Sequence, residues 1–310
     1  MVVVLTGGTG GAKLTHGLSL VLPQEELFIV CNTGDDFILH GLHISPDLDT
    51  IIYTLAGIAD PAKGWGIKDD TFNFLEALAR LGGEAWFKLG DRDLATHITR
   101  TALLAKGRPL SQATETVCKA LGVKSVVVPM SDDRIETRIV TPAGEISFQE
   151  FFVKRRCADE VTAVKFSGAE SSRPSPGIEA AILAAPLVIV CPSNPVTSMG
   201  PILAVPGIRA ALKQTRARVI AVSPIIRDAP FSGPAHKLMA AAGMEVSAFG
   251  VAVAYADFLD LIFIAREDRA LTEQFYTLKV EARTAAILLD SPAARARLAK
   301  EIVAAAAYAP

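Results

Sequence analysis

Short apolar runs rich in valine and isoleucine recur along the chain, and stretches with helical periodicity lie between them. Such near-continuous runs are typical of strands covered on both faces, and the intervening stretches are long enough for crossover helices. The alternation predicts an α/β fold, with a Rossmann-like, mostly parallel sheet and helices on both faces. The expected strands are residues 2–5, 27–31, 125–129, 161–166, 187–191, 218–223 and 261–265, and the expected helices are residues 11–21, 71–81, 94–106, 111–121, 178–185 and 208–215.

Two segments depart from this alternation. Residues 134–148 alternate between apolar and polar types around the turn sequence Pro-Ala-Gly, which predicts a β-hairpin. Residues 32–123 carry helical patterns and no convincing strand. We therefore expect one α/β unit, residues 1–310, with a core of residues 1–31 and 124–310 and a helical insertion subdomain of about residues 32–123 above the functional site.

The first expected strand runs directly into a glycine-rich turn, in the sequence VVVLTGGTGGAKL. Glycines let the backbone approach a phosphate, which the amide groups and the positive end of the next helix then attract. A dinucleotide fingerprint would need glycine where Lys13 stands, and a Walker A loop would need Ser or Thr after the lysine. We expect phosphate or pyrophosphate binding, and a ligand-free tight turn is the alternative. The expected phosphate-binding residues are Gly7, Gly8, Thr9, Gly10, Gly11 and Lys13, the last as a counter-charge.

Two acidic motifs follow the second expected strand, NTGDD at residues 32–36 and SPDLD at residues 45–49. Carboxyl ends of neighbouring parallel strands face one crevice, so these acids should border the glycine loop. Asp47 and Asp49 could share a divalent cation if the backbone there is extended or turning, and Mg²⁺ often takes one or two carboxylates plus phosphate oxygens. The alternative is an ordinary helix start, with Ser45 as the N-cap.

Three later polar loops, at residues 88–93, 129–134 and 191–201, are further candidates for the same functional site. In the last of them Ser193 and Asn194 suit hydrogen bonding to a flat heterocycle or a phosphate. The histidines lack HExxH-type spacing and no nucleophile elbow is present. The sequence therefore favours direct transfer between two bound substrates, with a metal ion and backbone amides stabilising the phosphoryl charge.

Composition narrows the class of partner. A net charge of −2 gives no general attraction to nucleic acid or to an anionic membrane, so we expect neither as a partner. The four cysteines are too far apart for a zinc or redox motif. The first apolar run is short and follows no basic region, and the later apolar stretches are short or interrupted by charges. We expect a cytoplasmic protein.

Five motifs together resemble one known family: GGTGGAKL, CNTGDDFILHGLHISPDLDTIIYTLAG, FKLGDRDLATH, PMSDDRIETRI and CPSNPVTSMGPIL. In this order and across almost the whole chain, they resemble the 2-phospho-L-lactate transferases of coenzyme F-420 biosynthesis, the bacterial members more closely than the archaeal ones. The resemblance implies an enzyme that joins the deazaflavin Fo (7,8-didemethyl-8-hydroxy-5-deazariboflavin) to the phospholactyl or phosphoenolpyruvyl group of a guanosine diphosphate-type donor. The donor would be lactyl-2-diphospho-5′-guanosine or enolpyruvoyl-2-diphospho-5′-guanosine. GMP would leave and coenzyme F-420-0, or its dehydro form, would be the product.

The resemblance also assigns site residues and a cofactor. Asp49 and Lys88 match positions assigned to Fo binding, and Ser193 and Asn194 join them in the expected Fo site. Mg²⁺ is implied as cofactor, with Asp35 and Asp49 as its expected ligands, and Asp49 would orient or deprotonate the attacking hydroxyl. A homodimer is implied as well.

Two questions stay open at the level of sequence. The three-carbon acid on the donor could be phospholactate, phosphoenolpyruvate or phosphoglycerate. The rival function is a nucleotide-binding regulatory protein of the YvcK-like group, which shares a similar fold and glycine loop but has no known transferase activity. The motifs HISPDLDT and PSNPVTSMGPIL favour the transferase.

Overall fold

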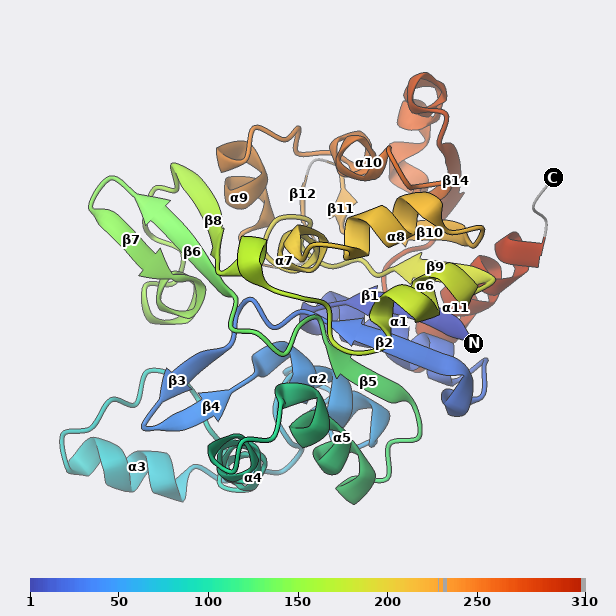
Figure 1. Ribbon diagram of the computed structural model, residues 1–310. Coiled ribbons are helices and arrows are strands. Elements are labelled where there is room, and N and C mark those ends of the chain that lie inside the picture. Colours follow the sequence, from blue (N-terminus) through green and yellow to red (C-terminus); the bar gives the residue numbers. More distant parts are fainter. Residues whose placement is uncertain (228, 231–232, 308–310) are drawn as a thin grey trace.

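A seven-stranded sheet forms the centre of the protein in a computed structural model, which describes residues 1–227, 229–230 and 233–307 (Figure 1). The strand order is β14-β13-β10-β9-β1-β2-β5, and all neighbouring pairs are parallel. The expected α/β architecture is confirmed. The strands are β1 (Val2–Thr6), β2 (Leu27–Cys31), β5 (Val126–Pro129), β9 (Leu187–Val190), β10 (Arg218–Val222), β13 (Leu261–Ala265) and β14 (Glu281–Ala285).

Both faces of the sheet are covered, as the near-continuous apolar runs predict. Val3 and Leu5 of β1 pack into one hydrophobic cluster, and Val2 and Val4 pack into another on the opposite face. Full burial of one such side chain contributes about 1.5–3 kcal/mol, so the two clusters hold the layers together. On the Val3 side lie α6 (Ile178–Ala184), α7 (Met199–Ala204), α8 (Ile208–Gln214), α9 (Ala235–Ala241) and α10 (Ala248–Tyr255); on the Val2 side lie α1 (Gly8–Ser19), α2 (Pro46–Leu55), α5 (Leu110–Ala120) and α11 (Pro292–Ala307).

The strands expected from the sequence differ from the observed sheet in two places: one strand was misassigned and another was missed. The run at 161–166 is wrong as a member of the parallel sheet, because β8 (Ala163–Ser167) pairs antiparallel with β6 (Glu136–Thr141). Its half-buried, alternating side chains, with Lys165 exposed, suit a sheet covered on one face only. The missed strand is β14, an edge strand whose sequence EARTA has no apolar run to reveal it.

The hairpin predicted for residues 134–148 is confirmed. β6 pairs antiparallel with β7 (Gly144–Ser147), and the tight connection joins Thr141 to Gly144. A π-helical turn follows at Glu150–Lys154, and such turns are frequent at functional sites. Short 3-10 helices lie at Gln24–Glu26 and Ala169–Ser171, and a longer one lies at Arg266–Leu278.

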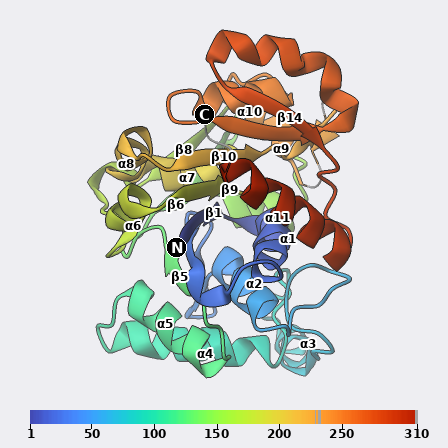
Figure 2. The same ribbon diagram turned by 90° about the vertical axis from the view of Figure 1, so that its right-hand side faces the viewer.

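Residues 32–123 connect β2 to β5 and lie at one end of the molecule, with α9 and α10 toward the other end (Figures 1 and 2). The segment contains α2, α3 (Asn73–Arg80), α4 (Asp93–Ala105) and α5, and also a hairpin of β3 (Phe37–Leu39) and β4 (Leu42–Ile44). The expectation of no strand there is therefore wrong. The sequence did not reveal this hairpin because each strand has only three residues and the chain turns tightly between them, at His40 and Gly41.

The proposed division into a core and an insertion subdomain stays a prediction. Helices α2 and α5 from the 32–123 segment contribute to the same hydrophobic cluster as the sheet. None of the helices in the described part of the chain is both long and apolar enough to cross a membrane.

Candidate active site

A cleft of about 460 Å³ opens at the carboxyl ends of β1, β2, β9 and β10. The chain builds the sheet outward from β1 in both directions, so β1 and β9 flank a topological switch point, the usual ligand site of open parallel sheets. The volume lies within the range of small-molecule sites. Of the residues expected from the sequence, those that line the cleft are Gly7, Gly8, Thr9, Gly10, Asp35, Asp49, Lys88, Ser193 and Asn194.

The glycine loop passes from β1 into α1, and different structural constraints require glycine at its different positions. Gly8 has a φ of 64°, in the left-handed region that favours glycine. A Cβ on Gly10 would lie 2.4 Å from the carbonyl oxygen of Pro192, and one on Gly11 would lie 2.2 Å from Thr6 Oγ1. The loop can therefore pack tightly under the loop that follows β9, while the first turn of α1 faces the cleft, where the Gly8 amide hydrogen-bonds the Asp47 carboxyl. Gly11 is buried beneath this turn, and Lys13 is not among the described residues that line the cleft.

Ser193 and Asn194 lie in the loop after β9, which packs against the glycine loop. Ser193 Oγ accepts a hydrogen bond from the Gly7 amide (3.2 Å) and donates one to the Gly7 carbonyl (2.7 Å). Asn194 Oδ1 accepts from the amides of Val196 (2.9 Å) and Thr197 (3.3 Å). Both side chains line the cleft, but the Ser193 contacts fix the loop after β9 against the glycine loop, and the Asn194 contacts fix the backbone of its own loop.

Two buried carboxyl groups, Asp35 and Asp47, meet at one amide. Asn32 Nδ2 donates to Asp47 Oδ2 (2.9 Å) and to Asp35 Oδ2 (3.2 Å). Burial raises the pKa of Asp47 to about 6, and burial together with the neighbouring Asp47 raises the pKa of Asp35 well above its usual range. Asp35 Oδ1 has no aligned hydrogen-bond donor in the part of the chain that the structure describes. A bound cation favours the ionised form of such carboxyl groups and would lower these pKa values.

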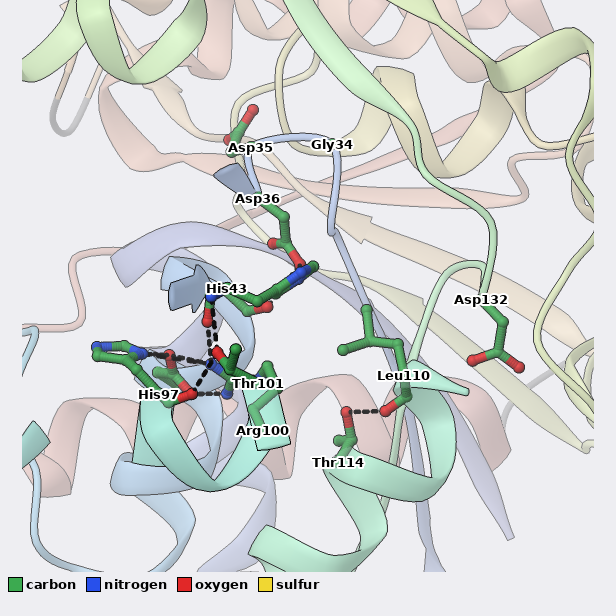
Figure 3. Close-up of polar contacts among 12 residues, drawn as sticks. Gly34, Asp35, Asp36, His43, His97, Arg100, Thr101, Leu110, Thr114 and Asp132 are labelled. Carbon is green, nitrogen blue, oxygen red and sulfur yellow. Dashed lines mark hydrogen bonds and ion pairs between the residues drawn. The ribbon is translucent and has the colours of Figure 1, made fainter. Parts of the chain in front are cut away.

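The neighbouring residue Asp36 belongs to a different set of contacts. Figure 3 shows Asp36 pointing toward His43, while Asp35 points away from it. Asp36 Oδ2 contacts His43 Nε2 (2.9 Å) and accepts from Ser45 Oγ (2.5 Å). The helix-start interpretation of the second acidic motif is therefore right about where α2 begins, but the Ser45 hydroxyl bonds Asp36 instead of capping the helix.

Asp49 lies in the first turn of α2, two residues from Asp47, and the two side chains diverge because the backbone there is helical. Both Asp49 oxygens accept from the guanidinium of Arg100, with Nη1 3.1 Å from Oδ2 and Nη2 paired with Oδ1. His97 Nδ1 lies 3.5 Å from Asp49 Oδ2, and His97 Nε2 lies 3.2 Å from Asp93 Oδ2. The Tyr53 hydroxyl donates to Asp93 Oδ1 (2.6 Å).

Asp49, Asp93 and His97 offer ligand atoms within 4.8 Å of one another, the spacing of a cation site. Arg100 already neutralises Asp49, and Tyr53 already engages Asp93. We therefore interpret the group as a buried network of ion pairs and hydrogen bonds. Sequence reasoning missed Arg100, His97 and Asn32, although the i, i+4 spacing of Asp93 and His97 on a helix is a signal that the sequence carried.

An aromatic wall completes the cleft. Phe148 and Phe152 stack with ring centroids 5.4 Å apart at 9°, and Trp65 and Phe87 line another part of the cleft. Lys88 lies 5.8 Å over the ring of Phe72 and also lines the cleft. Sequence reasoning did not single out these aromatic residues. A flat, partly apolar heterocycle can bind to such a wall.

Known proteins are similar to this chain over nearly its whole length. The family model described as 2-phospho-L-lactate transferase CofD matches residues 2–305. The chain is 44% identical to a phosphoenolpyruvate transferase of Streptomyces griseus, over 97% of this chain and 98% of that protein. It is 42% identical to a 2-phospho-L-lactate transferase of Methanosarcina mazei, over 97% of this chain and 99% of that protein.

A solved structure of a UPF0052-family protein from Bacillus halodurans is similar over 97% of this chain and 98% of its own, with a TM-score of 0.63. Its sequence identity of 15% means that this likeness shows the fold alone.

Proposed function

We propose that this chain, which belongs to the 2-phospho-L-lactate transferase CofD family, joins Fo to the phospho-acid of a guanylylated donor in its cleft. Family membership makes the chain a transferase of the phospholactate or phosphoenolpyruvate type. The observation that carries the finer proposal is the composition of one cleft, which is lined by glycines at a helix N-terminus, by aromatic side chains and by acids.

The donor diphosphate binds at the first turn of α1 in this proposal. Gly8, Thr9 and Gly10 line the cleft there, and the amides and positive end of a helix attract phosphate. The first turn of α1 has no acidic residue of its own, but the Asp47 carboxyl accepts a hydrogen bond from the Gly8 amide, and Mg²⁺ at Asp47 would offset that charge. Gly7 also lines the cleft, Gly11 packs closely beneath this turn, and Lys13 stays a prediction as a counter-charge.

Fo binds along the aromatic wall, with its ribityl chain toward Asp49 and Lys88. The ribityl hydroxyl attacks the phosphorus that carries the three-carbon acid, a new P–O bond forms, and the bond to GMP breaks. Asp49 orients the hydroxyl and accepts its proton, in keeping with the role of a carboxylate base. Holding the two substrates in one cleft supplies much of the rate enhancement through proximity.

Mg²⁺ fits the acidic side of this cleft. Asp35 and Asp47 are buried beside one amide, their pKa values are raised, and one Asp35 oxygen has no aligned donor among the described residues, so a nearby cation would favour the ionised form of both. We propose Asp35 and Asp47 as the residues that hold Mg²⁺, which would neutralise charge on the diphosphate. Asp49 as a ligand stays a prediction, because Arg100 already neutralises its charge.

Product analysis tests this function. Purified protein is incubated with Fo, Mg²⁺ and each of three guanylylated donors, carrying phospholactate, phosphoenolpyruvate or phosphoglycerate, and the products are identified by mass spectrometry. We expect one donor to give a phosphodiester of Fo together with GMP. The absence of any Fo ester with all three donors would contradict the proposal. A protein that leaves Fo fluorescence unchanged but binds a nucleotide sugar would support the regulatory alternative.

A homodimer is a further proposal that rests on the family alone. Sedimentation equilibrium measures it directly, and a mass near the 32.8 kDa of one chain would contradict it.

A further inference from the structure

Arg100 is the largest fully buried side chain among the described residues, and it carries a charge. It lies on α4 with 0% of its surface exposed, and it is not among the described residues that line the cleft. Both of its terminal nitrogens donate to Asp49, in a bidentate pair that fixes the plane of the carboxylate. Any effect of Arg100 on a substrate in the cleft must therefore pass through another residue.

The other contacts of Arg100 hold it in one place. Arg100 Nη1 lies 3.4 Å from the carbonyl oxygen of His43 and 3.4 Å from His97 Nδ1. His97 Nε2 lies 3.2 Å from Asp93 Oδ2, so the ring stands between Arg100 and Asp93. Figure 3 shows His97, Arg100 and Thr101 projecting from one helix toward His43, whose amide donates to Thr101 Oγ1 (2.8 Å).

Stability alone is a weak reason for this arrangement. Taking a guanidinium and a carboxylate out of water costs several kcal/mol per ion, and well-packed apolar residues in their place often give equal or greater stability. A bidentate pair offers instead a carboxylate whose position and orientation are fixed. Asp49 is also the residue for which the proposed function needs a fixed orientation.

We propose that Arg100 is a positioning residue, which holds Asp49 in the orientation that the attacking hydroxyl requires. This inference rests on the proposed function, since Asp49 is its point of contact with Fo. Arg100 acts on the transfer step and leaves the diphosphate subsite at the start of α1 unaffected. His97 supports Arg100 from the cleft side, and Tyr53 in turn holds Asp93 beside His97.

A double-mutant cycle tests this assignment. The variants are Arg100→Met, Asp49→Asn and the two combined, with kcat and the KM of each substrate measured for all of them. We expect Arg100→Met to lower kcat about 100-fold, with the donor KM within about threefold of wild type, because only the orientation of Asp49 is lost. The combined variant should be no slower than Asp49→Asn, because Arg100 acts only through Asp49.

Two further variants are measured with the cycle: Arg100→Lys as the conservative substitution and Arg108→Met as the control. Lysine keeps the charge but cannot form the bidentate pair, so it should recover part of the lost kcat. Arg108 is exposed and its side chain bonds only Gln112 among the described contacts, so Arg108→Met should keep wild-type kcat. If Arg100→Met does not fold, as judged by its thermal melt, the same cycle is run with Arg100→Lys.

The outcomes separate the inference from the function on which it rests. Multiplicative losses in the combined variant, or a near-wild-type kcat in Arg100→Met, would overturn the positioning role while the transferase proposal stands. A wild-type protein that forms no Fo ester overturns both.

Discussion

At the scale of single residues, the site depends on side chains that hold other side chains or backbone groups. Asn32 joins Asp35 to Asp47, Arg100 fixes Asp49, and Ser193 ties the loop after β9 to Gly7. The expected site residues were recognisable because they occur in contiguous polar motifs at strand ends. Arg100 was not recognisable from the sequence. Its role depends on which face of α4 lies against α2, some 50 residues earlier in the chain.

Removal of the Ser193 hydroxyl tests its role as a clamp. Ser193→Ala leaves the buried Gly7 amide without its acceptor, so the free energy of unfolding should fall by about 1–3 kcal/mol. The donor KM should rise, because the glycine loop loses its fixed position, while Fo binding changes little. Urea unfolding and steady-state kinetics measure the two effects. Unchanged stability together with a lost Fo affinity would instead make Ser193 a direct Fo ligand, as expected from the sequence.

Thermal shifts with Mg²⁺ identify the metal ligands. Mg²⁺ at about 100 times its Kd should stabilise the wild-type protein by about 2.7 kcal/mol, because only the folded chain brings the ligands together. Asp35→Asn and Asp47→Asn should abolish the rise in melting temperature. Asp290→Asn, at an exposed position that does not line the cleft, should retain it. A shift lost in Asp49→Asn and kept in Asp47→Asn would return the assignment to Asp49.

At the scale of elements, burial on one or both faces explains which sequence predictions succeeded. The strands at the centre of the sheet were recognisable because both faces are covered and their sequences are continuously apolar. β8 and β14 were misassigned or missed because a half-covered strand mixes apolar and charged residues. The hairpin of β3 and β4 is stabilised by contacts with Trp86, Phe87 and Leu89, which no local pattern reveals.

Helix α3 depends on an acid from a distant loop. Asp91 accepts hydrogen bonds from the amides of Asn73 (3.0 Å) and Phe74 (3.0 Å) in its first turn, and from Thr71 Oγ1 (2.6 Å). The hydrogen bond from Thr71, with those from the helix amides, lowers the pKa of Asp91 to about 2. A carboxyl whose pKa is depressed on folding stabilises the protein above its unfolded pKa of about 4.

The stabilisation from Asp91 should therefore be complete above about pH 4 and should disappear as the pH falls toward 2. Asp91→Ala should be less stable than wild type at pH 6, and the difference should shrink at pH 2.5. Urea unfolding at the two pH values measures it, with exposed Asp290→Ala as the control. A difference that is equal at both pH values would contradict the role of the ionised carboxyl.

At the scale of the whole molecule, the order of the strands creates the site. The chain adds β2 and β5 on one side of β1 and β9, β10, β13 and β14 on the other, so the loops after β1 and β9 diverge and leave a crevice. The α/β class followed from the alternation of elements, whereas the strand order depends on packing between distant segments. The cleft also receives α2, α4 and the π-helical turn, which bring its acids and its aromatic wall together.

The central claim is that one cleft holds both substrates and transfers the phospho-acid directly from GMP to Fo. The most direct test is the ratio of GMP released to Fo ester formed, followed over time with and without Fo. We predict a ratio of about 1:1 and no release of GMP without Fo, because an attacking hydroxyl is required and no protein nucleophile takes part. Release of GMP at the same rate without Fo, or without any ester, would contradict direct transfer.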